Sequence, residues 1–295
     1  MPASRPRSTS SLVPGALLLL AGLVCLPLAS LAAGESAVWL ATGPEGGTYR
    51  SIYGANLESQ MRGTKVFYRD TAGSAQNVEL LREGRADIAF VQADVFAVAF
   101  AAGETADLQV IGRLSDECLY VAHRIGGRIG QFADLKAPPD GQPASVAVGP
   151  PDGGPAGSWR WLSERDPELA GNEVDAQGGT LALNQLGVGR FDAVVWVTDP
   201  LNLEHKMLRA VNRNDALAIM PVTDAALLEP LADGTVIYKK QKVALTGGFR
   251  PKKVETICTS ALVLMRRDAD TALVERVSDV ISLKRDLIAP RKTSN

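Results

Sequence analysis

The sequence is poor in the residues that usually form metal centres and aromatic binding platforms. Its 295 residues include only two histidines and three cysteines, and aromatic residues make up 5% of the chain. No His-x-x-x-His or Cys-x-x-Cys spacing occurs, and no motif typical of a bound cofactor is present. We therefore expect neither a metal site nor a cofactor.

The chain also lacks an excess of positive charge and, after residue 33, any long apolar run. It carries 31 basic and 33 acidic residues. Arg5 and Arg7 precede an apolar run over 12–33 that ends in small residues, a pattern typical of a secretory signal peptide, with an uncleaved anchor as the alternative. Without residues 1–33, the chain has 29 basic and 33 acidic residues. This charge balance does not favour binding to nucleic acid. We expect a signal peptide over 1–33 and an exported protein with no nucleic-acid partner.

Two cysteines, Cys118 and Cys258, remain after the signal peptide. An oxidising compartment would allow them to form a disulfide. Each also lies in an apolar run of strand type, where a buried free cysteine is at least as common. The sequence leaves both states open and slightly favours unpaired cysteines.

Short apolar runs alternate with helix-like segments along the chain. AVWLAT, KVFYRD and DIAFVQ are each followed by such a segment, and the alternation resumes with ASVAVG and DAVVWVT. This pattern predicts an α/β protein with a mainly parallel sheet. The length suits two similar domains in tandem.

An internal repeat supports two domains of like topology. ATGPEGGTYRS (41–51) is echoed by AVGPPDGGPAGS (147–158), and LREGRADIAFVQAD (81–94) by LGVGRFDAVVWVTD (186–199), with nearly equal gaps. The second motif predicts a helix that ends at a left-handed glycine, Gly84 or Gly189, followed by a buried strand. We expect a ligand cleft between the two domains.

The predicted domain boundaries follow from this organisation. Residues 34–124 and about 223–295 form domain I, and residues 125–222 form domain II, with the crossover placed near residues 123–127 and an uncertain return. Apolar residues at helical spacing over 271–288 predict a final helix that packs on domain I.

The glycine loop ATGPEGGTYR does not match a nucleotide-binding loop. It lacks the Gly-Lys-Ser/Thr ending of a triphosphate loop and the spacing of a dinucleotide loop. Small-residue loops open helices at three places, with Ser74 a natural N-cap in the second, and helix N-termini bind carboxylates without a lysine. We expect a small anionic or zwitterionic ligand. A less favoured alternative is a cleft hydrolase that uses Asp94 and Asp199.

These motifs together resemble the TAXI family of solute receptors, which serve tripartite ATP-independent periplasmic (TRAP) transporters. The resemblance rests on ATGPEGGTYRSIYG, TAGSAQNVELLREGRADIAFVQADV, CLYVAHR, FADLKAPPDGQPASVAVGPPDGG and FDAVVWVTDP, and it runs from about Val38 to the final helix. It implies a type II-like, two-domain periplasmic binding protein of the Venus flytrap kind, with no catalytic residues. Such a receptor binds glutamate, glutamine or a related amino acid or dicarboxylate and delivers it to a TRAP permease.

The resemblance also implies a set of ligand contacts. It carries over to Gly47, Thr48, Tyr49, Ser74, Asn77 and Gln92. From the second unit we add Gly153, Ser158, Trp196 and Asp199 as expected ligand-binding residues. The second loop, GPPDGGPAGSWR, departs from the Gly-Ser-Gly-Thr form of the family by its length, two prolines and Asp152. If Asp199 faces the cleft, an amino acid becomes a better ligand than a keto acid. A receptor of the same fold that serves an ABC importer or a sensor is the alternative.

Overall fold

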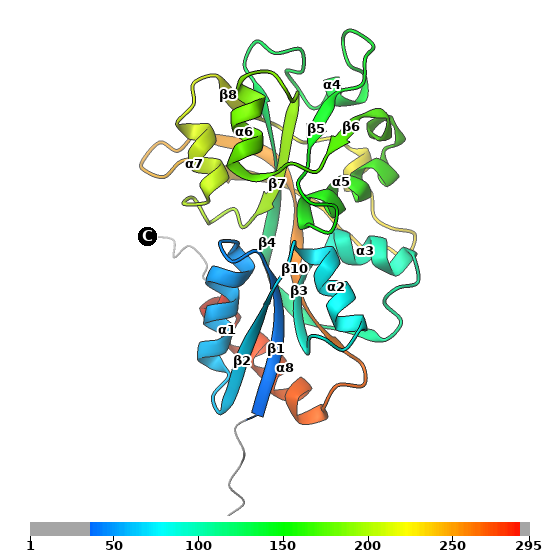
Figure 1. Ribbon diagram of the computed structural model, residues 1–295, viewed down its shortest axis with the longest axis vertical. Helices are drawn as coiled ribbons and strands as arrows, with labels where there is room; N and C mark the ends of the chain where they lie inside the picture. Colours follow the sequence, from blue (N-terminus) through cyan, green and yellow to red (C-terminus); the bar gives the residue numbers. More distant parts are fainter. Residues whose placement is uncertain (1–35, 290–295) are drawn as a thin grey trace, which may run out of the picture. The chain divides into compact units, whose positions relative to one another are not determined.

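The computed structural model describes residues 36–289, so the predicted signal peptide lies outside the described residues. The described residues form one compact unit. Its 10 strands join in one mixed sheet of order β2-β1-β3-β10-β4-β7-β5-β6, with β8 paired to β4 and β9 paired to β10 (Figure 1). The strands are β1 (Ser36–Gly43), β2 (Thr64–Asp70), β3 (Ile88–Gln92), β4 (Leu108–Arg124), β5 (Ser145–Ala147), β6 (Glu173–Asp175), β7 (Ala193–Thr198), β8 (Leu217–Met220), β9 (Lys239–Ala244) and β10 (Lys253–Arg266).

Helices cover both faces of this sheet. The α-helices are α1 (Ala55–Gln60), α2 (Ser74–Arg82), α3 (Ala93–Ala101), α4 (Ala133–Lys136), α5 (Gly154–Arg165), α6 (Gly179–Gly187), α7 (Lys206–Asn212) and α8 (Thr271–Ile288). A π-helical turn, η1 (Tyr49–Gly54), leads into α1, and the 3-10 turns are η2 (Pro167–Gly171) and η3 (Ala226–Leu228). We call strands β1 to β3 with α1, α2, α3 and α8 the first lobe, and strands β5 to β8 with α4 to α7 the second lobe.

The two lobes repeat the same local topology, as the sequence predicts. In the first lobe β1 pairs in parallel with both β2 and β3, and in the second lobe β5 pairs in parallel with both β6 and β7. Gly84 follows helix α2 and has a φ of 65°, and Gly189 follows helix α6 and has a φ of 78°. Both glycines adopt the predicted left-handed conformation. The two halves of the sequence repeat therefore fold alike.

A pair of equivalent aspartates ties the start of β3 to β1 in the first lobe and the start of β7 to β5 in the second lobe. The Asp87 carboxylate accepts a hydrogen bond from the Trp39 backbone N–H at 2.7 Å, and the Asp192 carboxylate accepts one from the Ser145 N–H at 2.8 Å. The backbone N–H of each aspartate donates back to the carbonyl of the same residue. The recurring aspartate of the sequence repeat thus has a structural role in both lobes.

The core lies on both faces of each half of the sheet because the strands are buried on both sides. In β3, Ile88 and Phe90 face α1 and α8, whereas Ala89 and Val91 face α2 and α3. The final helix α8 packs on the first lobe as predicted, through Val277, Val280 and Ile281. Leu283, one of the apolar residues of this helix, is 79% exposed, and the helix departs from helical geometry at the next residue, Lys284.

Two long strands, β4 and β10, run through both lobes. Strand β10 pairs antiparallel with β3 in the first lobe, and the C-terminal half of β4 pairs antiparallel with β7 and β8 in the second lobe. The parallel core of each lobe is thus part of a mixed sheet. Because these strands cross without a break, the proposed division at residues 124 and 223 stays a prediction.

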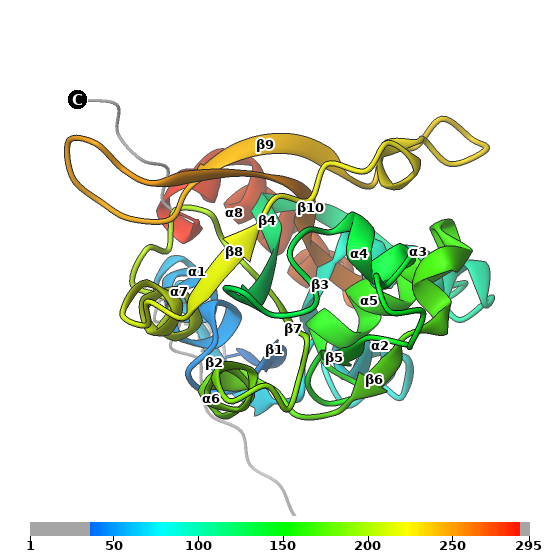
Figure 2. The same cartoon turned by 90° about the horizontal axis from the view of Figure 1, so that it is seen from above.

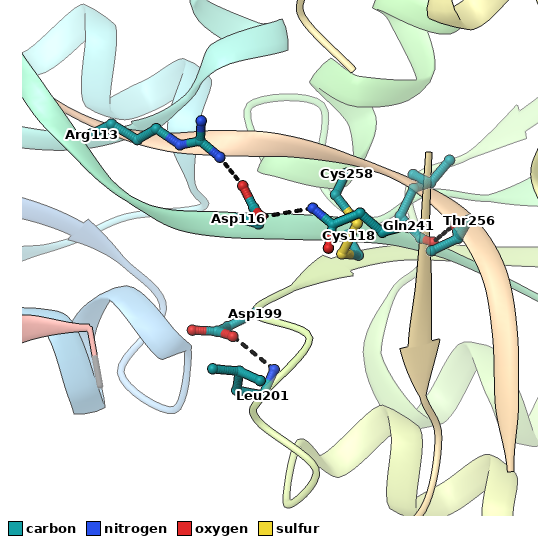
Figure 3. The surroundings of a disulfide bond; sticks show 9 residues. Arg113, Asp116, Cys118, Asp199, Leu201, Gln241, Thr256 and Cys258 are labelled. Carbon is teal, nitrogen blue, oxygen red and sulfur yellow. Dashed lines mark hydrogen bonds and ion pairs between the residues drawn. A yellow bond between two sulfur atoms is a disulfide. The ribbon is translucent and has the colours of Figure 1, made fainter. Parts of the chain in front are cut away.

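A disulfide joins the two crossing strands. Cys118 and Cys258 lie directly opposite each other in the β4–β10 ladder and form a disulfide bond (Figure 3). The slight preference for unpaired cysteines was therefore wrong. The sequence could not show the pairing, since the two cysteines are 140 residues apart and meet only through the antiparallel register of β4 and β10.

Candidate functional site

A cavity of about 470 Å³ lies where the two lobes meet, at the carboxyl ends of the parallel strands. This is the position at which open α/β sheets bind ligands, and the volume falls in the range of small-molecule sites. The structure brings the three predicted small-residue loops to this one cavity. The lining residues from these loops are Gly43, Pro44, Gly46, Gly47, Thr48, Tyr49, Ala72, Gly73, Ser74, Gly149, Pro150, Gly153, Gly154 and Pro155.

The first loop forms a turn that leads into a helix. The Gly47 N–H donates to the Pro44 carbonyl at 2.8 Å, and η1 begins two residues later. Thr48 Oγ1 lies 3.3 Å from Thr198 Oγ1 of the second lobe and accepts a hydrogen bond from Asn202 at 3.2 Å. The loop therefore lines the cavity and also contacts the second lobe directly.

Tyr49 turns its phenol toward an acidic residue that the sequence analysis missed. The Tyr49 hydroxyl donates to the Glu117 carboxyl at 2.5 Å, and Glu117, only 4% exposed, lines the cavity from β4. Burial raises the pKa of Glu117 to about 8, and the carboxylates of Asp199 and Asp94 add to the shift, whereas the Tyr49 hydrogen bond opposes it. At neutral pH this side chain is a neutral carboxylic acid, which can donate a hydrogen bond. Its one sequence signal was an acidic residue directly before the strand-like run CLYVAHR.

Ser74 and Gln92 line the cavity and hold each other in place. The Ser74 hydroxyl accepts a hydrogen bond from the Gln92 backbone N–H at 3.1 Å, and the Gln92 amide donates to Ser158 Oγ across the lobe interface at 3.0 Å. The sequence predicted Ser74 as the N-cap of α2, and this was wrong. Gly73 occupies the N-cap position with a φ of 145°, and Ser74 is the first residue of the helix. Its hydroxyl is directed to β3 instead.

Ser158 and Asn77 lie behind the wall of the cavity. Ser158 donates to Asp94, which also accepts from the Tyr238 hydroxyl at 2.6 Å. The Asn77 amide donates to the carbonyls of Thr42 and Phe90 at 3.1 and 2.8 Å, which ties α2 to β1 and β3. Both side chains are fully buried and support the site from outside the lining.

Asp199 does not line the cavity either. Its carboxylate accepts hydrogen bonds from the Tyr53 hydroxyl at 2.5 Å and the Leu201 N–H at 2.8 Å, and burial raises its pKa (Figure 3). The argument for an amino acid over a keto acid required an inward-facing Asp199, and this requirement is not met. With Asp94 bound to Ser158 and Tyr238, neither carboxyl of the hydrolase alternative faces the cavity.

The second-lobe loop presents glycines and prolines to the cavity, and Asp152 points elsewhere. Gly153 lines the cavity as expected, whereas Asp152 is exposed and its carbonyl accepts a hydrogen bond from the Gln76 N–H of the first lobe at 3.2 Å. A Cβ on Gly73 would lie 2.6 Å from the Gly154 nitrogen. The two loops are therefore in backbone contact, and a side chain at Gly73 would block that contact.

Trp196 lines the cavity from β7 with an unused hydrogen-bond donor. Its ring stacks on Tyr120 at 5.4 Å between centroids, and its buried Nε1 has no hydrogen-bond partner within the described residues. Buried donors are nearly always paired. Nε1 is therefore a buried donor that the described residues leave without an acceptor.

Residues at the start of α7 line the cavity, although none of them was among the ligand contacts predicted from the sequence. His205 lines the cavity together with Lys206 and Met207. Burial and the neighbouring Lys206 lower the pKa of His205 to about 4, so its ring is neutral at neutral pH. Its buried Nδ1 has no hydrogen-bond partner in the part of the chain that the structure describes. Lys206 is the single basic side chain in the lining. No glycine loop or repeat marked this segment.

Comparison with known proteins identifies the family of this chain. The model of the NMT1-like family matches residues 40–281, which is most of the sequence. The chain belongs to the NMT1-like family. No curated protein matches this NMT1-like chain in sequence.

Solved structures share the fold of this NMT1-like protein. The substrate-binding protein of an amino acid ABC transporter matches with a TM-score of 0.50 and 13% identity, over 84% of this chain and 92% of that one. A protein named Tv2483, solved with L-arginine, matches with a TM-score of 0.51 and 14% identity, over 84% of each chain. A Xanthomonas citri protein solved with ATP matches with a TM-score of 0.51 and 13% identity, over 85% and 86%. These matches confirm the predicted α/β fold of a two-domain, type II-like periplasmic binding protein.

Two further properties of the NMT1-like chain bear on how it could act. Among residues 36–289, no helix is long and apolar enough to cross a membrane.

Helices α2, α5 and α6 begin at residues in or next to the cavity wall, so the positive ends of their dipoles face it. With a neutral Glu117, a neutral His205 and one lysine, the cavity is suited to a ligand with a small negative charge.

Proposed function

We propose that this NMT1-like protein is a periplasmic solute receptor that binds a small carboxylate-bearing solute in the cavity between its lobes. The observation that carries the proposal is the cavity of about 470 Å³ between the lobes, whose lining includes Trp196 with a buried Nε1 that no described residue pairs. A carboxylate oxygen would accept a hydrogen bond from this donor and would be favoured by the three helix N-termini. The signal peptide predicted from the sequence and the disulfide both fit an exported protein.

The charges in the cavity narrow the ligand class. A dicarboxylate brings two negative charges, whereas Lys206 is the one basic side chain of the lining. The neutral Glu117 acid can donate a hydrogen bond to a second oxygen or an amide oxygen of the ligand without repelling it. Glutamine, or glutamate with its ammonium group, therefore fits better than a dicarboxylate without an amino group.

Delivery to a TRAP permease rests on the resemblance to TAXI receptors. The alternative, delivery to an ABC importer, is supported by the shared fold with the substrate-binding protein of an amino acid ABC transporter. Uptake of the identified solute in cells separates the two. Loss of uptake when an ionophore collapses the ion gradient supports TRAP delivery, and loss only on ATP depletion supports the importer.

Thermal-shift screening against amino acids, keto acids and dicarboxylates tests the receptor function. A ligand that binds only the folded protein at a hundred times its Kd stabilises it by about 2.7 kcal/mol. We expect at least one small monocarboxylate or zwitterion to raise the melting temperature. If no small carboxylate does so, the receptor proposal is wrong.

A conservative variant tests the role of Trp196 in that binding. Trp196→Phe keeps an aromatic ring against Tyr120 but removes the Nε1–H, and we expect the affinity for the identified solute to fall by roughly tenfold. Trp161→Phe is the matched control because Trp161 is equally buried but lies in the core against Tyr238, away from the cavity. Equal affinities of the two variants would contradict the role assigned to Trp196.

A further inference from the structure

The hairpin formed by β9 and β10 carries an unusual concentration of positive charge. Between Lys239 and Glu255 there are six basic residues and one acidic residue, whereas the whole chain has a net charge of −2. All six basic residues are exposed: Lys239, Lys240, Lys242, Arg250, Lys252 and Lys253. Among the described residues only Lys240 of these six has an ion-pair partner, Glu255 at 3.8 Å. We call residues 239–255 the basic hairpin.

The tip of the basic hairpin presents an aromatic side chain to solvent. Phe249 is 97% exposed and follows two glycines, the second of which has a φ of 92°. The loop is closed at its base by hydrogen bonds from the Leu245 N–H to the Lys252 carbonyl at 2.8 Å and from the Lys252 N–H to Thr246 Oγ1 at 3.0 Å. Figure 2 shows this loop projecting beyond the neighbouring elements at the edge of the sheet.

Protection of a sheet edge explains part of this pattern but not all of it. Strand β9 pairs only with β10, and lysines on an edge strand oppose association with other sheets. That role covers the strand lysines. It explains neither Phe249 nor the cations beside it in the loop, because the loop presents no ladder edge.

We propose that the basic hairpin docks on an anionic phospholipid surface. Phe249 enters the boundary between headgroups and acyl chains, and Arg250, Lys252 and Lys253 contact lipid phosphates. Basic residues next to an exposed aromatic side chain are the combination by which peripheral segments bind anionic membranes. A protein interface usually has an apolar core of several residues, whereas Phe249 is the single large exposed apolar side chain of the hairpin.

The basic hairpin lies outside the lining of the ligand cavity. No residue of 239–255 lines the cavity. The proposal is therefore independent of the solute receptor function, and either can fail without the other.

Vesicle sedimentation tests the proposal with the chain from residue 35 on, which forms a compact unit. We expect it to bind vesicles that contain phosphatidylglycerol, to bind phosphatidylcholine vesicles far more weakly, and to be released by salt. Phe249→Ala should weaken binding by roughly tenfold, because it removes the apolar contribution. Lys252→Glu with Lys253→Glu should weaken it by about 25-fold or more, since each basic residue contributes about fivefold near an anionic surface.

Two matched variants serve as controls. Phe100→Ala removes another exposed phenylalanine, 67% exposed at the end of α3, and Arg62→Glu with Arg160→Glu reverses two exposed charges outside the hairpin. Both should bind vesicles like the unmodified protein. The proposal is overturned if the unmodified protein ignores anionic vesicles, if the hairpin variants bind as it does, or if the controls lose binding equally. Loss of binding to a purified permease without any effect on vesicle binding would assign the hairpin to a protein partner instead.

Discussion

Glu117 shows how one side chain can set the electrostatics of the whole cavity. It is buried on β4, hydrogen-bonded to Tyr49, and faces the carboxylates of Asp94 and Asp199 in a region of low polarity. Burial therefore keeps it protonated at neutral pH, where an ordinary glutamate would be ionised. A neutral acid in this place removes a negative charge that would repel an anionic ligand.

The raised pKa of Glu117 predicts a pH dependence of stability. Its pKa of about 8 in the folded protein exceeds the usual value of 4.5, so the folded state holds a proton that the unfolded chain has lost. The contribution is fully present below about pH 4.5 and is lost as the pH rises to about 8. We expect the free energy of unfolding to fall over this window by at least about 1 kcal/mol more in the unmodified protein than in Glu117→Gln.

Chemical denaturation of both proteins between pH 5 and 9 measures this difference. Because Asp94 and Asp199 also have raised pKa values, the comparison with the variant is needed to isolate Glu117. Glu173→Gln, at an exposed position, controls for the substitution itself. Parallel pH profiles of the unmodified protein and Glu117→Gln would show that Glu117 is ionised in the folded protein.

At the scale of elements, β4 and β10 are the connection between the lobes, and the disulfide joins them. Cys118 and Cys258 lie next to Glu117 and Thr259 in the ladder, where the strands leave the first lobe and enter the second. A cross-link there constrains the two strands that must bend or twist if the lobes move. It also closes a loop of 140 residues, which limits the unfolded chain.

Removal of this disulfide should destabilise the protein strongly. We expect Cys118→Ala with Cys258→Ala to lower the free energy of unfolding by about 2–4 kcal/mol, because the unfolded chain gains conformational freedom. Urea denaturation of the variant and of the unmodified protein, each with and without reductant, measures this. Reductant should destabilise the unmodified protein and leave the variant unchanged. If reductant does not change the stability of the unmodified protein, the cysteines are not paired in solution.

At the scale of the whole molecule, hydrogen bonds and close packing hold the lobes together around the cavity. Gln92 reaches Ser158, Tyr53 reaches Asp199, and Gly157 of α5 lies so close to Val95 of α3 that a Cβ there would be 2.7 Å from a Val95 methyl carbon. Gly157 lies inside a helix, where alanine is a better residue than glycine. A methyl group at this position therefore affects the approach of the lobes and not the conformation of α5.

Gly157→Ala should open the protein without unfolding it. We expect a larger radius of gyration in small-angle X-ray scattering, roughly tenfold weaker binding of the identified solute, and a second lobe that is no less stable, since alanine favours the helix by about 1 kcal/mol. Val95→Ala in the same chain removes the clash and should restore closure and affinity. A variant that stays as compact as the unmodified protein would show that α3 and α5 adjust to the extra methyl group.

The sequence by itself determined the local topology of the lobes. Apolar runs between glycine turns predicted the strands, and the repeat predicted that β1 and β5, like β3 and β7, are equivalent, because these signals depend on residues close together in the chain. Seven of the ten expected ligand contacts line the cavity, and their role in binding stays a prediction. Six of those seven lie in segments that the repeat marked, and Ser74 lies in the other small-residue loop.

Only the tertiary structure decided how the cavity is completed. Glu117 and His205 line the cavity although the sequence did not mark them, and the predicted contacts Asn77, Ser158 and Asp199 lie outside its lining. Cys118 forms a disulfide with Cys258. Each of these placements depends on contacts between segments far apart in the chain. The strand β10 returns from near the end of the sequence to pair with both β3 and β4. Periodicity and turn residues carry no information about such long-range pairing, so the charge of the cavity and the cross-link between the lobes could be read only from the folded protein.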